Sequence, residues 1–343
     1  MLFLSRFLKQ IINNGTLHII DYKGKKHTIS NGTQTEVTIR FHTKKVERLI
    51  LLNAELALGE GYMDRSITIE QGNLYDLLNL CTNNFHKRSA PHFSIFLSGF
   101  LYCLRRFHQY NPVERSKKNV HHHYDLKKEF YDLFLDEDRQ YSCAYFTQLD
   151  DDLNGAQLNK KRHLAAKLHL KPGQKILDIG CGWGGLSLYL AKLMDVEVTG
   201  LTLSEEQYKI ATKRAEESGL SHRVKFYLQD YRQEQGENIY DRIVSVGMFE
   251  HVGVNHYQEF FSTVHRLLKS DGVALLHSIG RSFGPGATNG WIRKYIFPGG
   301  YCPALSEVLP SLEKSKFYIG DMEILHRHYA ETLKFWTIRL CSI

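Results

Sequence analysis

Five short runs rich in branched apolar residues alternate with amphipathic helical patterns in the second half of the chain. The runs, which predict strands, cover residues 175–179, 197–201, 224–228, 242–246 and 272–276. The helical patterns between them cover residues 186–193, 204–218 and 256–268. Repeated strand–helix units predict an α/β fold in which a parallel sheet carries helices on both faces. Ligands of such sheets bind at the carboxyl ends of the strands, so the loops after the strands are the expected place of a site.

The first predicted strand runs into a glycine-rich loop. Residues 178–185 have the sequence Asp-Ile-Gly-Cys-Gly-Trp-Gly-Gly and precede a helical pattern, whose start presents free N–H groups. Gly180, Gly182 and Gly185 match the dinucleotide fingerprint. A nicotinamide site also needs an acid at the end of the second strand, where this chain has Thr202. The loop instead resembles the first motif of Rossmann-like methyltransferases, which bind S-adenosylmethionine, and a tight turn without a ligand is the structural alternative.

The N-terminal third has a different pattern, typical of a small α+β unit. Its predicted elements are strands at 16–22 and 36–41 and helices at 4–12, 46–58 and 74–81. The chain of 343 residues is long for one compact domain. We expect an N-terminal domain over 1–110, a polar linker over 111–119 that contains Pro112, and a second domain over 120–343.

The composition excludes several classes of protein. Hydrophobic residues make up 43% and charged residues 24%, which is typical of a globular protein and excludes disorder and coiled coils. The net charge of +7 is not clustered, so it favours an anionic ligand or membrane surface and predicts no nucleic-acid partner. Six scattered cysteines without a CxxC pair indicate no zinc, redox or disulfide site. His121, His122 and His123 are adjacent and do not converge on one point, so no metal site is expected.

The apolar segments favour a cytoplasmic protein that touches the membrane peripherally. Residues 1–10 lack the uninterrupted apolar core of a signal peptide. Residues 94–104 are too short to span a bilayer and are followed by Arg105 and Arg106. The amphipathic start and this segment would suit an anionic membrane surface, and packing of 94–104 between the two domains is the alternative.

Seven segments point, in order along the chain, to one family. They cover residues 140–146, 177–184, 200–207, 247–253, 276–279, 295–300 and 328–333. Together they resemble the cyclopropane-fatty-acyl-phospholipid synthase family, and residues 56–64 resemble its extra lipid-binding domain. The resemblance implies a Rossmann-like class I methyltransferase sheet, a smaller N-terminal α+β domain of the lipid-binding type, and a homodimer.

The resemblance also implies the reaction. The family transfers a methylene group from S-adenosylmethionine to the cis double bond of an unsaturated phospholipid acyl chain and forms a cyclopropane ring. Such chemistry passes through a carbocation and needs a general base in a pocket that excludes water. The family uses bicarbonate as that base. By resemblance, its holders are the backbone N–H groups of Cys143 and Ile279 and the side chains of Glu250, His277 and Tyr329.

The site for the methyl donor follows from the same resemblance. The implied residues are Tyr141, Ser142, Asp178, Gly180, Gly182, Gly184, Thr202, Leu203, Gln207 and Tyr231. Tyr141 and Ser142 are expected near the amino-acid part of the donor, and Thr202 and Gln207 near its ribose and adenine. Tyr231 offers an aromatic face for adenine, although ordinary aromatic packing would explain it equally well.

Two departures from the family pattern lead to alternative interpretations. Residues 127–129 are Lys-Lys-Glu, where the family has a Gly-Asn-Asp type of turn after His123-Tyr124-Asp125. The sequence stops at residue 343, whereas family members continue into a final antiparallel strand. Residues 317–322 resemble the edge strand that would pair with it, so we expect a bare edge and exposed apolar surface. The alternatives are a methyltransferase of this family with another lipid or small-molecule acceptor, and an inactive, shortened lipid-binding homologue.

Overall fold

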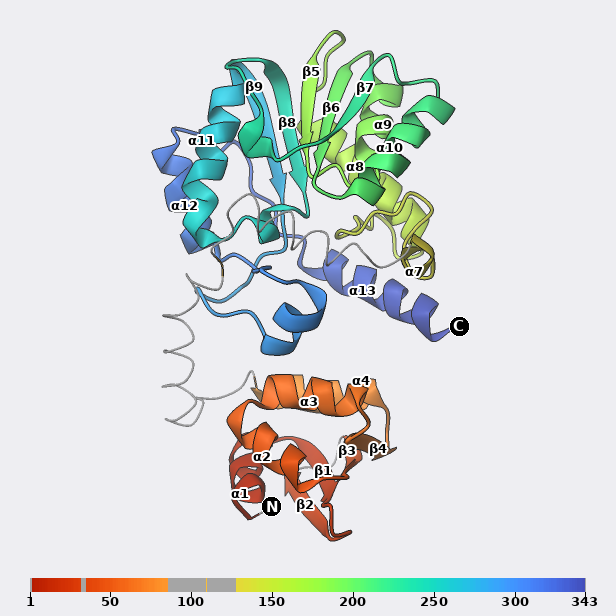
Figure 1. Cartoon of the computed structure of the whole chain (residues 1–343), viewed down its shortest axis with the longest axis vertical. Helices are drawn as coiled ribbons and strands as arrows, with labels where there is room; N and C mark the ends of the chain where they lie inside the picture. The colour runs from red at the N-terminus through yellow and green to blue at the C-terminus, as the bar shows by residue number, and fades with distance from the viewer. Residues whose placement is uncertain (1, 32–34, 86–108, 110–127, 343) are drawn as a thin grey trace. The chain divides into compact units, whose positions relative to one another are not determined.

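A computed structural model of the chain describes residues 2–31, 35–85, 109 and 128–342. The chain forms two compact units: Met1–Cys103 with Thr288–Ile296, and Leu104–Ala287 with Phe297–Ile343 (Figure 1). Several features of the sequence lie outside the described residues: the apolar segment 94–104, the pair Arg105 and Arg106, the predicted linker 111–119, the histidines at 121–123, the 123–125 motif and Lys127.

The second unit is built on five parallel strands. They are β5 (Lys175–Ile179), β6 (Glu197–Thr202), β7 (Val224–Leu228), β8 (Tyr240–Val246) and β9 (Leu268–His277). Their order in the sheet is β7-β6-β5-β8-β9, and every pairing is parallel. The strand order reverses at β5, which leaves a crevice at the carboxyl ends of β5 and its neighbours. The predicted α/β fold with a parallel sheet is confirmed.

Helices cover both faces of this sheet, as Figure 1 shows. One face carries α8 (Leu153–Lys167), α9 (Gly185–Leu193) and α10 (Glu205–Glu217), and the other carries α11 (Tyr257–Leu267) and α12 (Leu305–Lys314). Neighbouring side chains of β5 enter opposite cores, because successive residues of a strand point to opposite faces. Ile176 packs with the first group of helices and Leu177 with the second, and both are fully buried. Each such burial contributes about 2 kcal/mol.

Further elements of this unit lie outside the sheet and the helices that cover it. They are α7 (Lys128–Asp132), the 3₁₀ turns η1 (Tyr231–Gln233), η2 (Phe249–His251) and η3 (Val254–His256), and α13 (His326–Cys341). The sequence pattern did not predict α8. Its buried face carries Gln157, Lys160 and Lys161, so the apolar periodicity that marks an amphipathic helix is missing.

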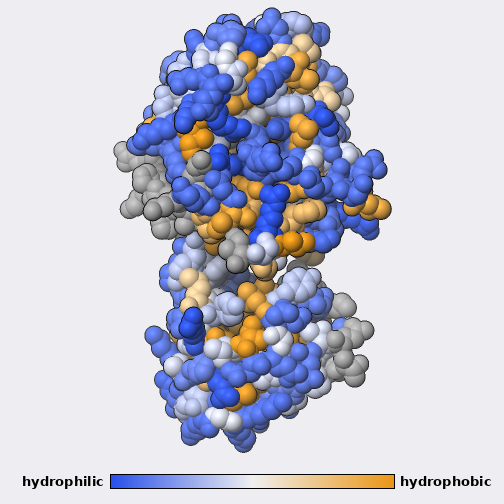
Figure 2. Space-filling model, turned by 90° about the vertical axis from the view of Figure 1, so that its right-hand side faces the viewer, coloured by the Kyte–Doolittle hydropathy of each residue, from blue (hydrophilic) through white to orange (hydrophobic). Residues whose placement is uncertain are grey.

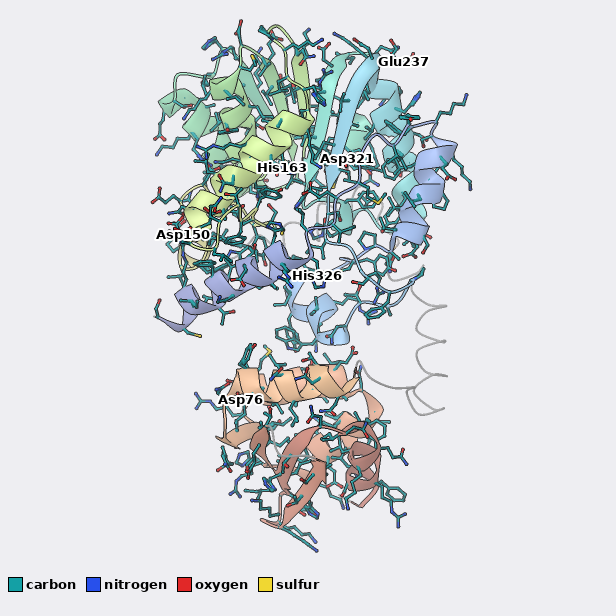
Figure 3. The ribbon with its side chains drawn as sticks, turned by 180° about the vertical axis from the view of Figure 1, so that it is seen from behind. Asp76, Asp150, His163, Glu237, Asp321 and His326 are labelled. Atoms are coloured by element: carbon teal, nitrogen blue, oxygen red, sulfur yellow. The ribbon has the colours of Figure 1, made fainter. Side chains whose placement is uncertain are left out.

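Residues 317–325 form no strand, so the expectation of an edge strand at 317–322 is wrong. Within the described part of the chain, β9 pairs with β8 alone. Residues 317–322 therefore have no neighbouring strand that could form hydrogen bonds with their backbone. Ion pairs attach this stretch to α8 instead: His163 Nε2 lies 2.6 Å from a carboxylate oxygen of Glu323, and Lys167 pairs with Asp321 (Figure 3). The exposed side chain of Tyr318 leaves apolar surface open there.

In its described residues, the first unit contains a four-stranded sheet and four α-helices. The strands β1 (Gly15–Ile20), β2 (Lys26–Asn31), β3 (Glu36–Phe41) and β4 (Ile67–Gln71) lie in the order β2-β1-β3-β4. The helices are α1 (Leu2–Ile11), α2 (Lys44–Leu52), α3 (Ala54–Met63) and α4 (Leu74–Phe85). The sequence did not predict β2 and β4, because these edge strands carry many polar residues.

The helix expected over 46–58 is two helices. Asn53 lies between them, and its side chain accepts a hydrogen bond from the Leu56 N–H at 3.2 Å, which caps α3. The π-helical turn η4 (Ile292–Ile296) belongs to the first unit although it comes late in the chain. There the Tyr295 hydroxyl donates to Glu60 at 2.8 Å.

We predict that Gly184→Ala lowers the free energy of unfolding by about 2–4 kcal/mol, because backbone strain adds to overpacking. Gly184 precedes α9 with φ +80°, and a Cβ there would lie 2.6 Å from Phe226 Cζ and 3.0 Å from Ala211 Cβ. Gly219→Ala is the matched control, since Gly219 has φ +67° but open space around it. Its expected loss is about 1 kcal/mol, from strain alone. Urea unfolding measures both, and equal losses would contradict the packing argument.

Candidate functional site

A pocket opens at the carboxyl ends of β5, β6, β7 and β8. Its lining residues are 139–142, 178–183, Leu186, 201–203, Gln207, 229–232, 246–248, His251 and Val252. Every residue predicted to bind the methyl donor is among them except Gly184. Gly184 packs against Phe226 and Ala211 instead, at the N-cap position just before α9.

The glycine loop leaves room for a ligand. The N–H groups of Gly180 and Cys181 both donate to the Leu201 carbonyl at 2.9 Å, which ties the loop to β6. Gly182 has φ +55°, and a Cβ added there would meet no protein atom within 4 Å. The space beside Gly182 is therefore available to a bound molecule, which suits a cofactor that approaches the backbone closely.

Asp178 lies beneath this loop in a buried position. It is 2% exposed, and one of its carboxylate oxygens accepts a hydrogen bond from Ser187 Oγ at 2.7 Å. Burial raises the pKa of the Asp178 carboxyl to about 6, because the charged form loses its hydration. The carboxylate therefore joins β5 to α9 at a cost in stability at neutral pH.

The end of β6 is neutral. Thr202 Oγ1 donates to Gln207 Oε1 at 2.8 Å, and both side chains are buried. Since the Gln207 oxygen accepts this bond, its amide N–H groups remain donors for a ligand. This pair occupies the place where a nicotinamide site would have an acid for the ribose.

The end of β7 carries a neutralised ion pair and a buried ring. Asp230 receives two hydrogen bonds of 2.8 Å from the Arg232 guanidinium. Tyr231 lines the pocket and also packs edge to face against Phe260, with ring centroids 5.3 Å apart. Tyr231 therefore belongs both to the pocket wall and to the core beneath α11, so the two interpretations of this residue are compatible.

Glu250 follows β8 and His277 ends β9, and each has a polar atom without a hydrogen-bond partner in the part of the chain that the structure describes. Glu250 Oε1 accepts from the Ile279 N–H at 2.6 Å. Within the described residues, Glu250 Oε2 and His277 Nδ1 are buried and have no partner. Burial raises the pKa of Glu250 and lowers that of His277 to about 4, with Lys160 acting in the same direction on His277. The imidazole is therefore neutral at pH 7.

Cys143 and Tyr329 approach this pair from two other segments. The Ala144 N–H donates to Thr332 Oγ1 of α13 at 3.0 Å, which docks α13 on the segment that carries Cys143. Burial raises the pKa of Tyr329, and nearby Tyr141 and Glu250 add to this effect. Burial also raises the pKa of the Cys143 thiol to about 11, so it is protonated and no nucleophile. The structure thus places Ile279 and Tyr329 near Glu250, and Cys143 near Tyr329, while His277 ends the strand next to the one that Glu250 follows.

The sequence did not identify the buried polar face of α8. Gln157 Nε2 donates to the carbonyls of Gln140 and Ser142, at 3.1 and 3.0 Å. Lys160 Nζ donates to Ser142 Oγ at 2.6 Å, and Lys161 pairs with Asp138. These contacts hold the segment that forms one wall of the pocket. Four further residues line the pocket but were not predicted from the sequence, namely Trp183, Gln229, Arg232 and His251. They lie in the loops that follow strands, and this position was the signal that could have identified them.

The described residues, 2–31, 35–85, 109 and 128–342, contain neither a cluster of potential metal ligands nor a helix that could span a membrane. No three His, Cys, Asp or Glu side chains in those ranges are grouped as metal ligands. None of the helices in the described part of the chain is both long and apolar enough to cross a bilayer.

Residues 112–342 match the model of the family described as mycolic acid cyclopropane synthetase. The chain belongs to this family. The family resemblance inferred from the sequence is thereby confirmed, and both fold and family are those of S-adenosylmethionine-dependent methyltransferases. Residues 3–90 match a domain of unknown function.

Three similar proteins illustrate the relationship. The chain is 37% identical over 306 residues to the cyclopropane-fatty-acyl-phospholipid synthase of Escherichia coli K12, a match that covers 89% of this chain and 76% of that protein. It is 41% identical over 227 residues to a probable fatty acid methyltransferase of Pseudomonas putida, covering 64% of this chain but only 57% of that protein. A crystal structure of a mycolic acid cyclopropane synthase complexed with SAH and CTAB superposes with a TM-score of 0.62 at 37% identity, over 68% of this chain and 84% of the other.

We predict that Asp178→Asn stabilises the ligand-free protein at pH 7.5 by roughly 2–3 kcal/mol, at about 1.4 kcal/mol per unit of pKa shift. The pKa in the folded state is about 6, above the ordinary 3.8, so the charged carboxylate destabilises the fold above pH 6. That cost disappears as the pH falls through 6 toward 4, and the gain from the variant should shrink with it. Urea unfolding at pH 7.5 and 4.5 measures this, and a gain that is equal at both values would refute the argument.

Proposed function

We propose that this chain transfers a methylene group from S-adenosylmethionine to the cis double bond of an unsaturated phospholipid acyl chain and closes a cyclopropane ring. The observation that carries the proposal is that Glu250 Oε2 and His277 Nδ1 are buried and have no partner within the described residues. We call these two residues, together with Cys143, Ile279 and Tyr329, the cradle. Family membership and the name of the Escherichia coli relative support the same reaction.

The reaction explains why such a cradle is buried. The alkene attacks the sulfonium methyl group, S-adenosylhomocysteine leaves, and the new methyl group loses one proton as the ring closes. Water would trap the intermediate cation, so the proton acceptor must lie in a dry pocket. A buried carboxylate is a poor choice by itself, because burial raises the pKa of Glu250.

The residues of the cradle fit a small anion. Bicarbonate, when bound, would supply the base that receives the proton. The neutral His277 and the Tyr329 hydroxyl offer donors, and Cys143 offers its backbone N–H. The Ile279 N–H donates to Glu250 in this structure. We therefore propose that the Ile279 N–H orients the Glu250 carboxyl. Ile279 would then act on the anion indirectly, through that carboxyl.

The donor site supports the same proposal. The glycine loop, the Thr202–Gln207 pair and the ring of Tyr231 line one pocket, whose residues accept a nucleoside without an acid at β6. Tyr141 and Ser142 belong to the segment 139–142, which forms one side of the same pocket. We propose that the amino-acid part of S-adenosylmethionine lies on that side.

A phospholipid substrate requires contact with a membrane surface. Helices of the first unit expose large apolar side chains, namely Leu52, Met63, Leu74, Tyr75 and Leu78. Figure 2 shows hydrophobic patches on a mostly hydrophilic surface. We propose that residues 1–110 form a lipid-binding domain, joined by 111–119 to a catalytic domain at 120–343. The protein would then attach peripherally to the inner face of the membrane, as a homodimer.

A second candidate has support from one observation. The Pseudomonas putida relative is named a probable fatty acid methyltransferase. A transfer that ends with a methyl branch begins with the same attack on the donor, and it differs in where the proton is lost.

The decisive assay mixes the full chain with labelled S-adenosylmethionine, bicarbonate and vesicles of unsaturated phospholipid. We expect acyl products that gain one CH₂ and lose the double bond to a ring, identified by mass spectrometry and by resistance to mild hydrogenation. A methyl-branched product would establish the second candidate. Binding of S-adenosylhomocysteine without any transfer would overturn the synthase proposal and leave a methyltransferase with another acceptor or an inactive homologue.

We predict that Glu250→Gln lowers turnover by about 10²-fold or more while S-adenosylhomocysteine binds within about twofold of normal. The amide keeps an acceptor for the Ile279 N–H but removes the ionisable group. Glu237→Gln is the matched control, because this exposed residue precedes β8, at the end opposite the site (Figure 3). Removal of dissolved carbon dioxide should slow the wild type, and added bicarbonate should restore it. Full activity without bicarbonate would exclude it as the base.

A further inference from the structure

Lys160 is a buried cation that the proposed reaction does not yet use. Its side chain is 2% exposed and lies on the face of α8 that contacts the pocket wall. Its Nζ donates to Ser142 Oγ at 2.6 Å, and Ser142 lines the pocket. Burying a lysine is costly, and burial lowers the pKa of Lys160 to about 8. We therefore expect the pocket to bind a ligand whose negative charge compensates the buried positive charge of Lys160.

The bond to Lys160 sets the direction of the Ser142 hydroxyl. An ammonium group has donors and no acceptor, so Ser142 Oγ must accept this bond. The hydroxyl proton is then directed elsewhere, and no acceptor for it is hydrogen-bonded within the described residues. Ser142 is therefore a hydroxyl donor, polarised by a cation, on the wall of the pocket.

The charges around Lys160 do not balance. Lys161 and Arg214 both pair with Asp138, and Asp136 is the carboxylate that most favours the charged form of Lys160. These three cations face two carboxylates, so one positive charge has no counterpart within the group. A carboxylate supplied by a ligand would provide it.

The other cations of the pocket wall are already paired. Arg139 forms an ion pair with Asp132, and Arg232 forms one with Asp230. The Lys160–Ser142 side is therefore the part of the described wall best suited to a carboxylate. S-adenosylmethionine carries one carboxylate, at its amino-acid end.

We propose that Lys160 is a positioning residue that acts through Ser142 to hold the carboxylate of the methyl donor. This inference rests on the proposed function, because it takes S-adenosylmethionine as the donor. It adds a residue from α8 to the site and gives a reason for its buried charge: the cation orients the hydroxyl, and the carboxylate compensates the cation.

The test compares two ligands by isothermal titration calorimetry on the full chain. S-adenosylhomocysteine carries the carboxylate, whereas 5′-methylthioadenosine has the same nucleoside and sulfur without the amino-acid group. Lys160→Met keeps the length of the side chain and removes its charge and donors. We expect it to weaken S-adenosylhomocysteine about 10- to 100-fold, the range for a lost hydrogen bond to a charged group. The affinity for 5′-methylthioadenosine should stay within about twofold.

Two further variants keep the test decisive. Ser142→Ala should cause the same selective loss, and the double variant should lose little more, because the two residues act in series. Lys209→Met, at an exposed lysine of α10, should change neither affinity. Should Lys160→Met fail to fold by its thermal melt, the Ser142→Ala arm decides.

The outcomes separate this inference from the proposed function. Equal losses for both ligands, or no loss for S-adenosylhomocysteine, would overturn the role of Lys160 while leaving the donor site intact. A wild-type protein that binds neither ligand would overturn the donor site itself, and the inference with it.

Discussion

The site depends on the direction of five strands. Because β5 to β9 are all parallel, their carboxyl ends lie along one edge of the sheet, and the loops that follow them meet there. The glycine loop after β5, the Thr202–Gln207 pair after β6 and Glu250 after β8 come from distant parts of the chain, yet they lie at this one edge. The apolar packing of helices on both faces holds the strands, and it leaves this edge as the place for chemistry.

Three segments outside the sheet complete the site, and polar contacts hold them together. The buried side chains of α8 bond the segment 138–143, and α13 bonds the next residues through Thr332 and His328. Buried polar groups must be satisfied, so these contacts fix where each segment lies. Glu250 Oε2 and His277 Nδ1 are among the buried polar atoms that have no partner within the described residues, and we propose that these two serve the reaction.

Periodicity predicted the parts whose burial is regular. The bounds predicted for β5, β7 and β3 are those of the structure, because branched apolar residues fill these strands. Helix α8 was missed because its buried face is polar, and the partners of Lys160 and Lys161, Ser142 and Asp138, lie outside the helix. The strand expected at 317–322 is absent because strand formation depends on a neighbour to pair with, which a local pattern does not report.

The sequence by itself determined the fold class and the family, and it named nine of the residues that line the pocket, because glycine loops and strand ends have local signatures. It named Cys143, Glu250, His277, Ile279 and Tyr329 through the resemblance, without their contacts. Only the tertiary structure decided that Ile279 holds Glu250, that Gly184 packs inward and that Lys160 stands behind Ser142. The physical reason is that hydrogen bonding and desolvation depend on which groups meet in space, and residues distant in the chain supply those groups.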